Sequence, residues 1–325
     1  MAPRRAGGYG SGGYSLCAGL FTSYWDQVSL GYSIVFIIIY IGISIALCCV
    51  RKRDNQGRKL IGLAYVAALF STLFSFILGL VNSIVVQCSD VTTETFNGLN
   101  ITSNVLYYLG IWGLLFAVTY KLNNMLRKQL GAVGMIYKAV PLALLGIMAA
   151  LFVAQLALSS YVSVGMNSYY YHDNLASIAM ITYRLRIATM VVYLVMVLIS
   201  AVLAGMTISA LRTRRLPAGD LVGWVAVLYF SMVTWSVFAV ASLALSISAD
   251  YLDITTSYAI SFVLTFFQAL SFLVLLGIAK HACWNANGTF SQQVYAPVMQ
   301  QQTAYGYGSG QSDYYQQPPA LVHAK

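Results

Sequence analysis

Charged residues are scarce in this chain of 325 residues: Lys, Arg, Asp and Glu together make up 8%, whereas hydrophobic residues make up 59%. A soluble globular domain carries about 25% charged residues, and a water-soluble fold of this length could not bury so much apolar surface. The composition therefore excludes an ordinary soluble domain and indicates a protein solvated by lipid. The net charge of +9 does not indicate a nucleic-acid partner, because the basic residues flank apolar segments.

Catalytic and ion-coupling groups are equally scarce. The chain has three histidines, His172, His281 and His323, too few and too scattered for the zinc site of a membrane hydrolase, and no Gly-x-Ser-x-Gly elbow is present. The centres of the apolar segments contain no ionisable residue, which argues against proton- or sodium-coupled transport. A retinal protein would need a lysine in the last segment, and none is there. We therefore expect neither an enzyme nor a cofactor-binding protein.

Long apolar segments dominate what is present, and each approaches the about 20 residues that a helix needs to cross the hydrocarbon core. Only helices and closed barrels satisfy their backbone polar groups in lipid, and unalternating apolar runs exclude a barrel. The sequence predicts an all-α membrane protein, a bundle of seven transmembrane helices. The predicted segments are 30–50, 60–86, 105–120, 135–158, 187–211, 221–248 and 257–279. The third is the shortest and could begin nearer Ile101.

The loops between these segments differ in charge on the two sides of the membrane. Of the 18 basic residues, 14 fall after the first, third, fifth or seventh segment, and six of the nine acidic residues fall on the other side. The positive-inside rule then places the N-terminus outside and the C-terminus in the cytoplasm. We expect a multi-pass protein of the plasma membrane with its basic loops facing the cytoplasm.

Composition divides the chain into three parts. Residues 1–28 are a Gly- and Tyr-rich segment predicted to be extracellular, and residues 29–280 are the membrane domain. Residues 281–325 are a Gln- and Tyr-rich tail, predicted to be cytoplasmic and disordered because such a polar, repetitive stretch cannot bury enough apolar surface to fold.

The five cysteines fall into two groups. Cys17 and Cys88 are both predicted outside, where they could form a disulfide or remain two free thiols. The others lie just inside the cytoplasmic boundary beside basic residues, either as palmitoylation sites or as small interfacial hydrophobic residues. These are Cys48, Cys49 and Cys283.

The first set of candidate ligand-contacting residues lies in the outer connection 159–186. Its tyrosines, including Tyr170 and Tyr171, form either an interfacial belt or an aromatic lid over an outward-facing cavity. Arg184 and Arg186 precede the fifth segment on the side that should be poor in Arg. They could pair with outer acidic residues or attract an anionic ligand to the outer mouth.

Neutral polar residues inside the apolar segments offer a second set of candidates. Gln155, Thr234 and Gln268 could line a path for an uncharged solute or lipid. Alternatively they form hydrogen bonds between helices, each contributing about 0.6 kcal/mol. Small residues repeat at four-residue spacing in the fifth segment, at Ala201, Gly205 and Ser209. This spacing predicts that another helix of the same chain packs closely there; the second alternative is a dimer face.

Over residues 30–279 the chain resembles the seven-transmembrane receptor class in topology, with basic inner loops and a juxtamembrane Cys283. Its Gln- and Tyr-rich tail is also similar to those of orphan seven-helix membrane proteins of filamentous fungi. The resemblance is one of architecture: Thr119-Tyr120-Lys121 replaces the acid-Arg-aromatic motif, Trp235 lacks a Trp-x-Pro kink, and the last segment has no Asn-Pro.

This resemblance implies a receptor or sensor that binds an extracellular ligand and couples to a cytoplasmic partner through its basic loops. The alternative from the residues themselves is a facilitator without ion coupling, a lipid-handling protein or a membrane scaffold. Membrane lipids are the expected surroundings in either case. The sequence leaves the ligand and the oligomeric state open.

The predicted orientation can be tested through Asn100, which begins an Asn-Ile-Thr glycosylation acceptor predicted to lie in the outer loop after the second segment. In a eukaryotic host, we expect a glycosidase-sensitive mobility shift on gels that Asn100→Gln abolishes. A shift that instead depends on Asn287, in the predicted cytoplasmic tail, would reverse the topology.

Overall fold

A computed structural model describes residues 23–52, 59–88, 93–129, 136–166, 175–213, 221–248 and 253–281. These residues all belong to one compact unit, Met1–Ala286. Within them the structure is helical and contains no strand. The helices are α1 (Tyr24–Lys52), α2 (Leu63–Cys88), α3 (Thr93–Phe116), a π-helical segment (Ala117–Leu122), α4 (Asn123–Gln129), α5 (Ile136–Met166), α6 (Leu175–Thr213), α7 (Leu221–Ser248) and α8 (Ile254–Lys280).

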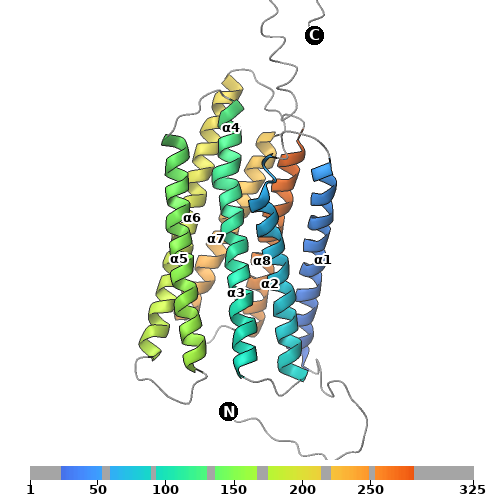
Figure 1. Cartoon of the computed structure of the whole chain (residues 1–325), viewed down its shortest axis with the longest axis vertical. Coiled ribbons are helices and arrows are strands. Elements are labelled where there is room, and N and C mark those ends of the chain that lie inside the picture. Colours follow the sequence, from blue (N-terminus) through green and yellow to red (C-terminus); the bar gives the residue numbers. More distant parts are fainter. Residues whose placement is uncertain are drawn as a thin grey trace, which may run out of the picture. The chain divides into compact units, whose positions relative to one another are not determined.

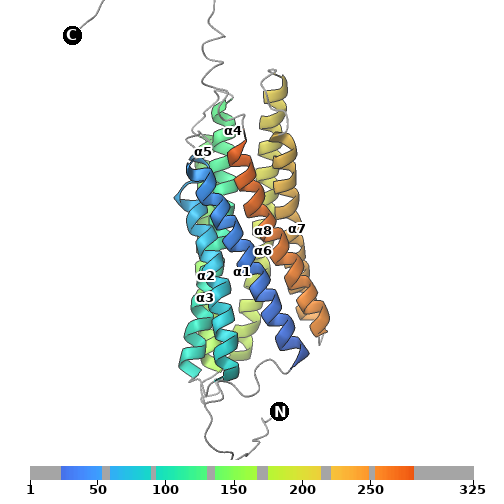
Figure 2. The same cartoon turned by 90° about the vertical axis from the view of Figure 1, so that its right-hand side faces the viewer.

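In the described part of the chain, seven helices are long and apolar enough to cross a membrane, with α3, the π segment and α4 forming one span, Glu94–Lys128. The prediction of seven helices is confirmed, and the structure indicates a multi-pass integral membrane protein. The helices run alternately up and down (Figures 1 and 2). We call the end at which α1, α3, α6 and α8 begin the lower end, as it is drawn in Figure 1.

The helices form a closed ring. Each packs against the next one in the chain, α5 follows the α3 span, and α8 returns to pack against α1. Large apolar side chains such as Val153, Met206 and Phe230 point outward and are 65–66% exposed. Such a surface is stable only against lipid. Inside, the buried polar residues among those described are Ser, Thr, Asn and Gln, with no charged side chain.

Two helices begin much earlier than the apolar pattern predicts. The third helix begins at Thr93 instead of residue 105, so Asn100 lies inside α3 and not in a loop. The fifth begins at Leu175 instead of residue 187, so Arg184 and Arg186 lie within α6. The physical reason is that a helix forms its backbone hydrogen bonds internally. It can therefore continue beyond the hydrocarbon core of the membrane. At 39 residues α6 is about 58 Å long, against about 30 Å of hydrocarbon.

The closest helix contact is between α2 and α3. A Cβ atom on Gly113 would lie 2.7 Å from the Cβ of Ala68, and one on Gly110 would overlap the Oγ1 of Thr72. Small residues on both helices therefore let the two backbones approach closely. By contrast, a Cβ on Gly205 would meet nothing within 4 Å. The prediction of intramolecular packing at the Ala201, Gly205 and Ser209 stripe is wrong, because Gly205 and Ser209 are exposed.

We expect Gly113→Ala to lower the melting temperature of the purified protein. The added methyl group would collide with Ala68, and overpacking costs about 1–3 kcal/mol, more than alanine gains in helix propensity. Gly146→Ala is the matched control, because a Cβ on Gly146 meets nothing within 4 Å. Ala68→Gly should restore stability to Gly113→Ala. Equal melting temperatures for the two single variants would contradict the contact.

Candidate functional site

A cavity lies between α1, α2, α3 and α8, near the lower end of the bundle. Its deeper chamber has a volume of about 360 Å³ and is lined mainly by hydroxyl groups. The lining residues that carry a hydroxyl are Ser29, Tyr32, Ser33, Ser75, Ser83, Ser103, Tyr107, Tyr258, Ser261 and Thr265. Among the described residues, no charged side chain lines this chamber.

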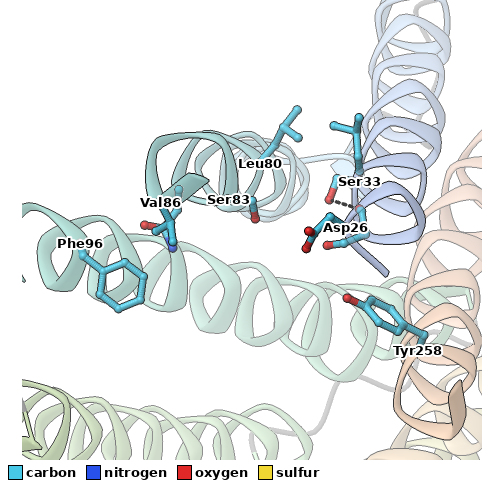
Figure 3. Close-up of a pocket in the computed structure, with 10 residues that line it drawn as sticks. Asp26, Ser33, Leu80, Ser83, Val86, Phe96 and Tyr258 are labelled. Carbon is cyan, nitrogen blue, oxygen red and sulfur yellow. Dashed lines mark hydrogen bonds between the residues drawn. The ribbon is translucent and has the colours of Figure 1, made fainter. Parts of the chain in front are cut away.

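A second chamber of about 250 Å³ continues the cavity toward the helix ends. It shares Ser29, Ser33, Ser83 and Tyr258 with the deeper chamber and adds Asp26, which is half-buried. Figure 3 shows the Asp26 carboxylate, the Ser83 side chain and the Tyr258 hydroxyl around one space between three helices.

The outer chamber is completed by one amide and several apolar side chains. Asn82 lies beside it, and its Oδ1 atom is buried without a hydrogen-bond partner among the described residues. The apolar lining consists of Leu30, Leu80, Val86 and Phe96. Asp26 is thus the only charged residue that lines either chamber in the described part of the chain.

Helical periodicity explains how the serines reach one space. Ser29 and Ser33 on α1, and Ser75, Gly79 and Ser83 on α2, recur every four residues and so share one face of each helix. Gly79 adds no side chain, and a Cβ there would meet nothing within 4 Å. The space is therefore left open on the α2 side.

Aromatic rings close the deep end of the cavity. Phe76 lines the deeper chamber, and its ring stacks at 6.2 Å on Phe36 and at 5.4 Å on Tyr40, which lie further along α1. Tyr40 in turn contacts Phe272 of α8 at 6.0 Å, and both side chains are fully buried. Between α1 and α8, Tyr32 and Thr265 share a hydrogen bond. Aromatic side chains therefore fill the bundle next to this end of the cavity.

A second polar cluster lies at the π segment. Asn123 Nδ2 donates to the carbonyl oxygen of Thr119 at 3.0 Å and to Ser200 Oγ of α6 at 2.9 Å. Ser200 Oγ is also 2.8 Å from the Tyr229 hydroxyl of α7. This buried chain joins three helices at a π turn, a local irregularity that is frequent at functional sites. Within the described structure, Thr119 Oγ1 and Asn123 Oδ1 have no partner.

Comparison of the chain with protein-family models, with curated proteins and with solved structures found no match. Function must therefore be inferred from the chemistry of these two clusters.

The three polar residues that were candidates for a solute path lie in different surroundings. Gln155 Nε2 donates to the Tyr108 hydroxyl of α3, and Thr234 is half-buried on α7. Gln268 lines a cavity of about 10 Å³ with Trp235 and Ser271, and neither Gln155 nor Thr234 lines it. That volume is about the size of one water molecule. The bond from Gln155 to Tyr108 is of the kind that the interhelical alternative predicts, while Gln155 Oε1 is buried without a partner among the described residues.

The remaining candidates lie elsewhere. Arg184 and Arg186 are exposed on α6, and Arg186 is close enough to the hydroxyls of Tyr107 and Tyr108 to interact electrostatically. Tyr170 and Tyr171 lie outside the described residues.

The cysteines give no site. Cys48 and Cys49 are exposed free thiols near the upper end of α1, whereas Cys88 is the last residue of α2. Cys17 and Cys283 lie outside the described residues. The disulfide and the palmitoylation sites stay predictions.

Asp26 and the serines of α1 were not predicted as site residues. Ser75, Ser261 and Thr265 stand out in the sequence as neutral polar groups within apolar segments, and the four-residue spacing was a usable signal. Spacing shows which residues share a helix face, but not that the faces of four helices converge.

The π-segment cluster predicts opposite effects for two variants. Thr119→Val replaces an unpaired buried hydroxyl with a methyl group of similar size, so we expect stability to stay unchanged or rise by about 1 kcal/mol. Asn123→Leu removes the donor to Thr119 and Ser200, so we expect stability to fall. Thermal unfolding of the two purified variants measures the difference. A loss with Thr119→Val as large as with Asn123→Leu would contradict the assignment.

Proposed function

We propose that this protein is a receptor or sensor of the membrane that binds a small polar molecule in the cavity between α1, α2, α3 and α8. The observation that carries the proposal is a hydroxyl-lined cavity with Phe76 in its wall and the stacked rings of Phe36 and Tyr40 behind it. A cavity near the lower end of the bundle suits binding and release at that end. A facilitator would need a continuous path, and buried rings occupy the place where it would run.

The cavity has a suitable size and position for this role. Ligand pockets are typically about 300–1,000 Å³, and the deeper chamber alone has about 360 Å³. Tyr258 and Thr265 line it at points about 10 Å apart along α8. On the predicted topology its mouth faces the cell exterior, so an extracellular molecule would reach it without crossing the hydrocarbon.

The π segment provides an element through which binding could be transmitted. Ser103 and Tyr107 line the cavity on α3, and the same span continues through the π segment to Asn123, which bonds to α6. A ligand that shifts α3 would change the π turn and the hydrogen-bonded chain of Asn123, Ser200 and Tyr229. The unpaired oxygens there offer an alternative set of hydrogen bonds, as a two-state element requires. The basic loops predicted at the upper end would then present a changed surface to a cytoplasmic partner.

Filling the cavity tests the proposal. In a thermal-shift screen of small polar molecules on the full chain, we expect at least one compound to stabilise the protein. Gly79→Leu, which adds a side chain in open space inside the cavity, should abolish that stabilisation without lowering the basal melting temperature.

Gly205→Leu is the matched control, because its Cβ is equally free of contacts but lies on the exposed face of α6. It should respond to the compound like the parent protein. Stabilisation that persists in Gly79→Leu, or a screen without a stabilising compound, would reject this cavity as the binding site. For the signalling part, proximity labelling should find a cytoplasmic partner whose recruitment depends on the compound.

A further inference from the structure

Five of the ten hydroxyls that line the deeper chamber have already used their protons. A serine hydroxyl has one proton and two acceptor lone pairs. Ser33, Ser83 and Ser261 each donate to the carbonyl oxygen four residues earlier, at 3.0, 3.0 and 2.9 Å. Ser75 and Ser103 donate to each other's carbonyl oxygens at 2.9 and 3.1 Å. All five hydroxyls can therefore offer only lone pairs to a ligand.

The outer chamber adds one further acceptor group. The Asp26 carboxylate, which lines this chamber, forms no side-chain hydrogen bond or ion pair with another described residue. Asp26 lies in the first turn of α1, where the backbone amides stabilise the ionised carboxylate. A ligand that complements this chamber must supply N–H or O–H donors and a positive charge.

The aromatic groups of the outer chamber also favour a cation. Tyr258 and Phe96 line it together with Asp26, and Trp25 stacks on Tyr258 with the ring centroids 5.7 Å apart. The faces of such rings attract ammonium groups. An anion would meet the Asp26 carboxylate, and none of the described residues that line either chamber is basic.

We infer that the ligand is a small hydroxylated primary amine, bound as an ammonium ion with its charge against Asp26 and its N–H groups on the lone pairs of the serines. The Tyr258 hydroxyl, for which no hydrogen bond is seen among the described residues, remains able to donate to a ligand oxygen. This inference rests on the proposed function, because it names the ligand class of the same cavity.

Three small probes that differ in one terminal group test the charge and the donors separately. Ethanolamine has an ammonium group, choline has a charge without N–H donors, and ethylene glycol has a hydroxyl without charge. Binding to the full chain in maltoside micelles can be measured by saturation-transfer NMR titration. We expect ethanolamine to bind about tenfold or more tightly than ethylene glycol, as charge-assisted hydrogen bonds imply, with choline weaker than ethanolamine. Equal binding of ethanolamine and ethylene glycol would overturn the inference.

Asp26→Asn removes the charge while keeping the shape of the side chain. It should weaken ethanolamine binding about tenfold and leave ethylene glycol unchanged. Asp253→Asn is the matched control, because Asp253 is exposed at the same end, just before α8, and lines neither chamber. Ethanolamine binding that is unaffected by Asp26→Asn would reject Asp26 as its counter-ion.

Failure of the inference can be told apart from failure of the proposed function. If Gly79→Leu abolishes binding of all probes but Asp26→Asn changes none of them, the cavity binds ligands and the amine assignment is wrong. If no probe binds, or if all probes bind Gly79→Leu as they bind the parent, both proposals fail.

A measurement that does not depend on affinity uses Gly79→Cys, which places a thiol in the open space of the deeper chamber. We expect aminoethyl methanethiosulfonate to modify it faster than the neutral hydroxyethyl reagent, after correction for their rates with a free thiol and with the parent protein. Adding Asp26→Asn should remove this preference. A rate ratio that Asp26→Asn leaves unchanged would show that the carboxylate does not attract cations into the cavity.

Discussion

The close approach of α2 and α3 is the contact on which the arrangement of the cavity depends. Lipid offers no hydrophobic driving force between helices, so their pairing relies on packing and hydrogen bonds. Gly110 and Gly113 leave room for Ala68 and Thr72, and the two helices consequently make the most extensive contact in the bundle. Because α2 is held so closely against α3, it packs much less extensively on α1. The cavity occupies the wider space among α1, α2, α3 and α8.

Among the described residues, the interior polar side chains are uncharged, and those that line the cavity offer more hydrogen-bond acceptors than donors. Serine is compatible with a membrane helix because its hydroxyl can donate to the carbonyl four residues back. That internal bond leaves the acceptor lone pairs free, so a face of serines such as Ser75 and Ser83 becomes a row of acceptors. Only one charged group, Asp26, lines the cavity among the described residues, and it does so at the mouth, where water can still reach it. These features together are the basis on which we infer a ligand that carries hydrogen-bond donors and a positive charge.

The sequence predicted the elements better than their ends. Apolar length alone gave the seven helices, because the hydrocarbon core fixes how many apolar residues each span needs. It misplaced the start of α3 and of α6, because the backbone stays helical well beyond the hydrocarbon, through Asn100 in one case and Arg184 in the other. The candidate site was predicted least well. Gln155 and Gln268 are the bulkiest neutral polar groups in the segments, but Gln155 bonds to a neighbouring helix and Gln268 lines only a water-sized space.

Composition and periodicity by themselves determined that this is a helical membrane protein, how many times it can cross, and that its spans carry neutral polar groups. They determine this because solvation by lipid acts on each segment separately. The tertiary structure decided which of the many serines meet, that Asp26 stands at their mouth, and that aromatic rings close the far end. Those facts depend on the rotation of four helices about their axes and on the spacing between them. Contacts between segments distant in the chain set both, such as the close approach of Gly113 to Ala68.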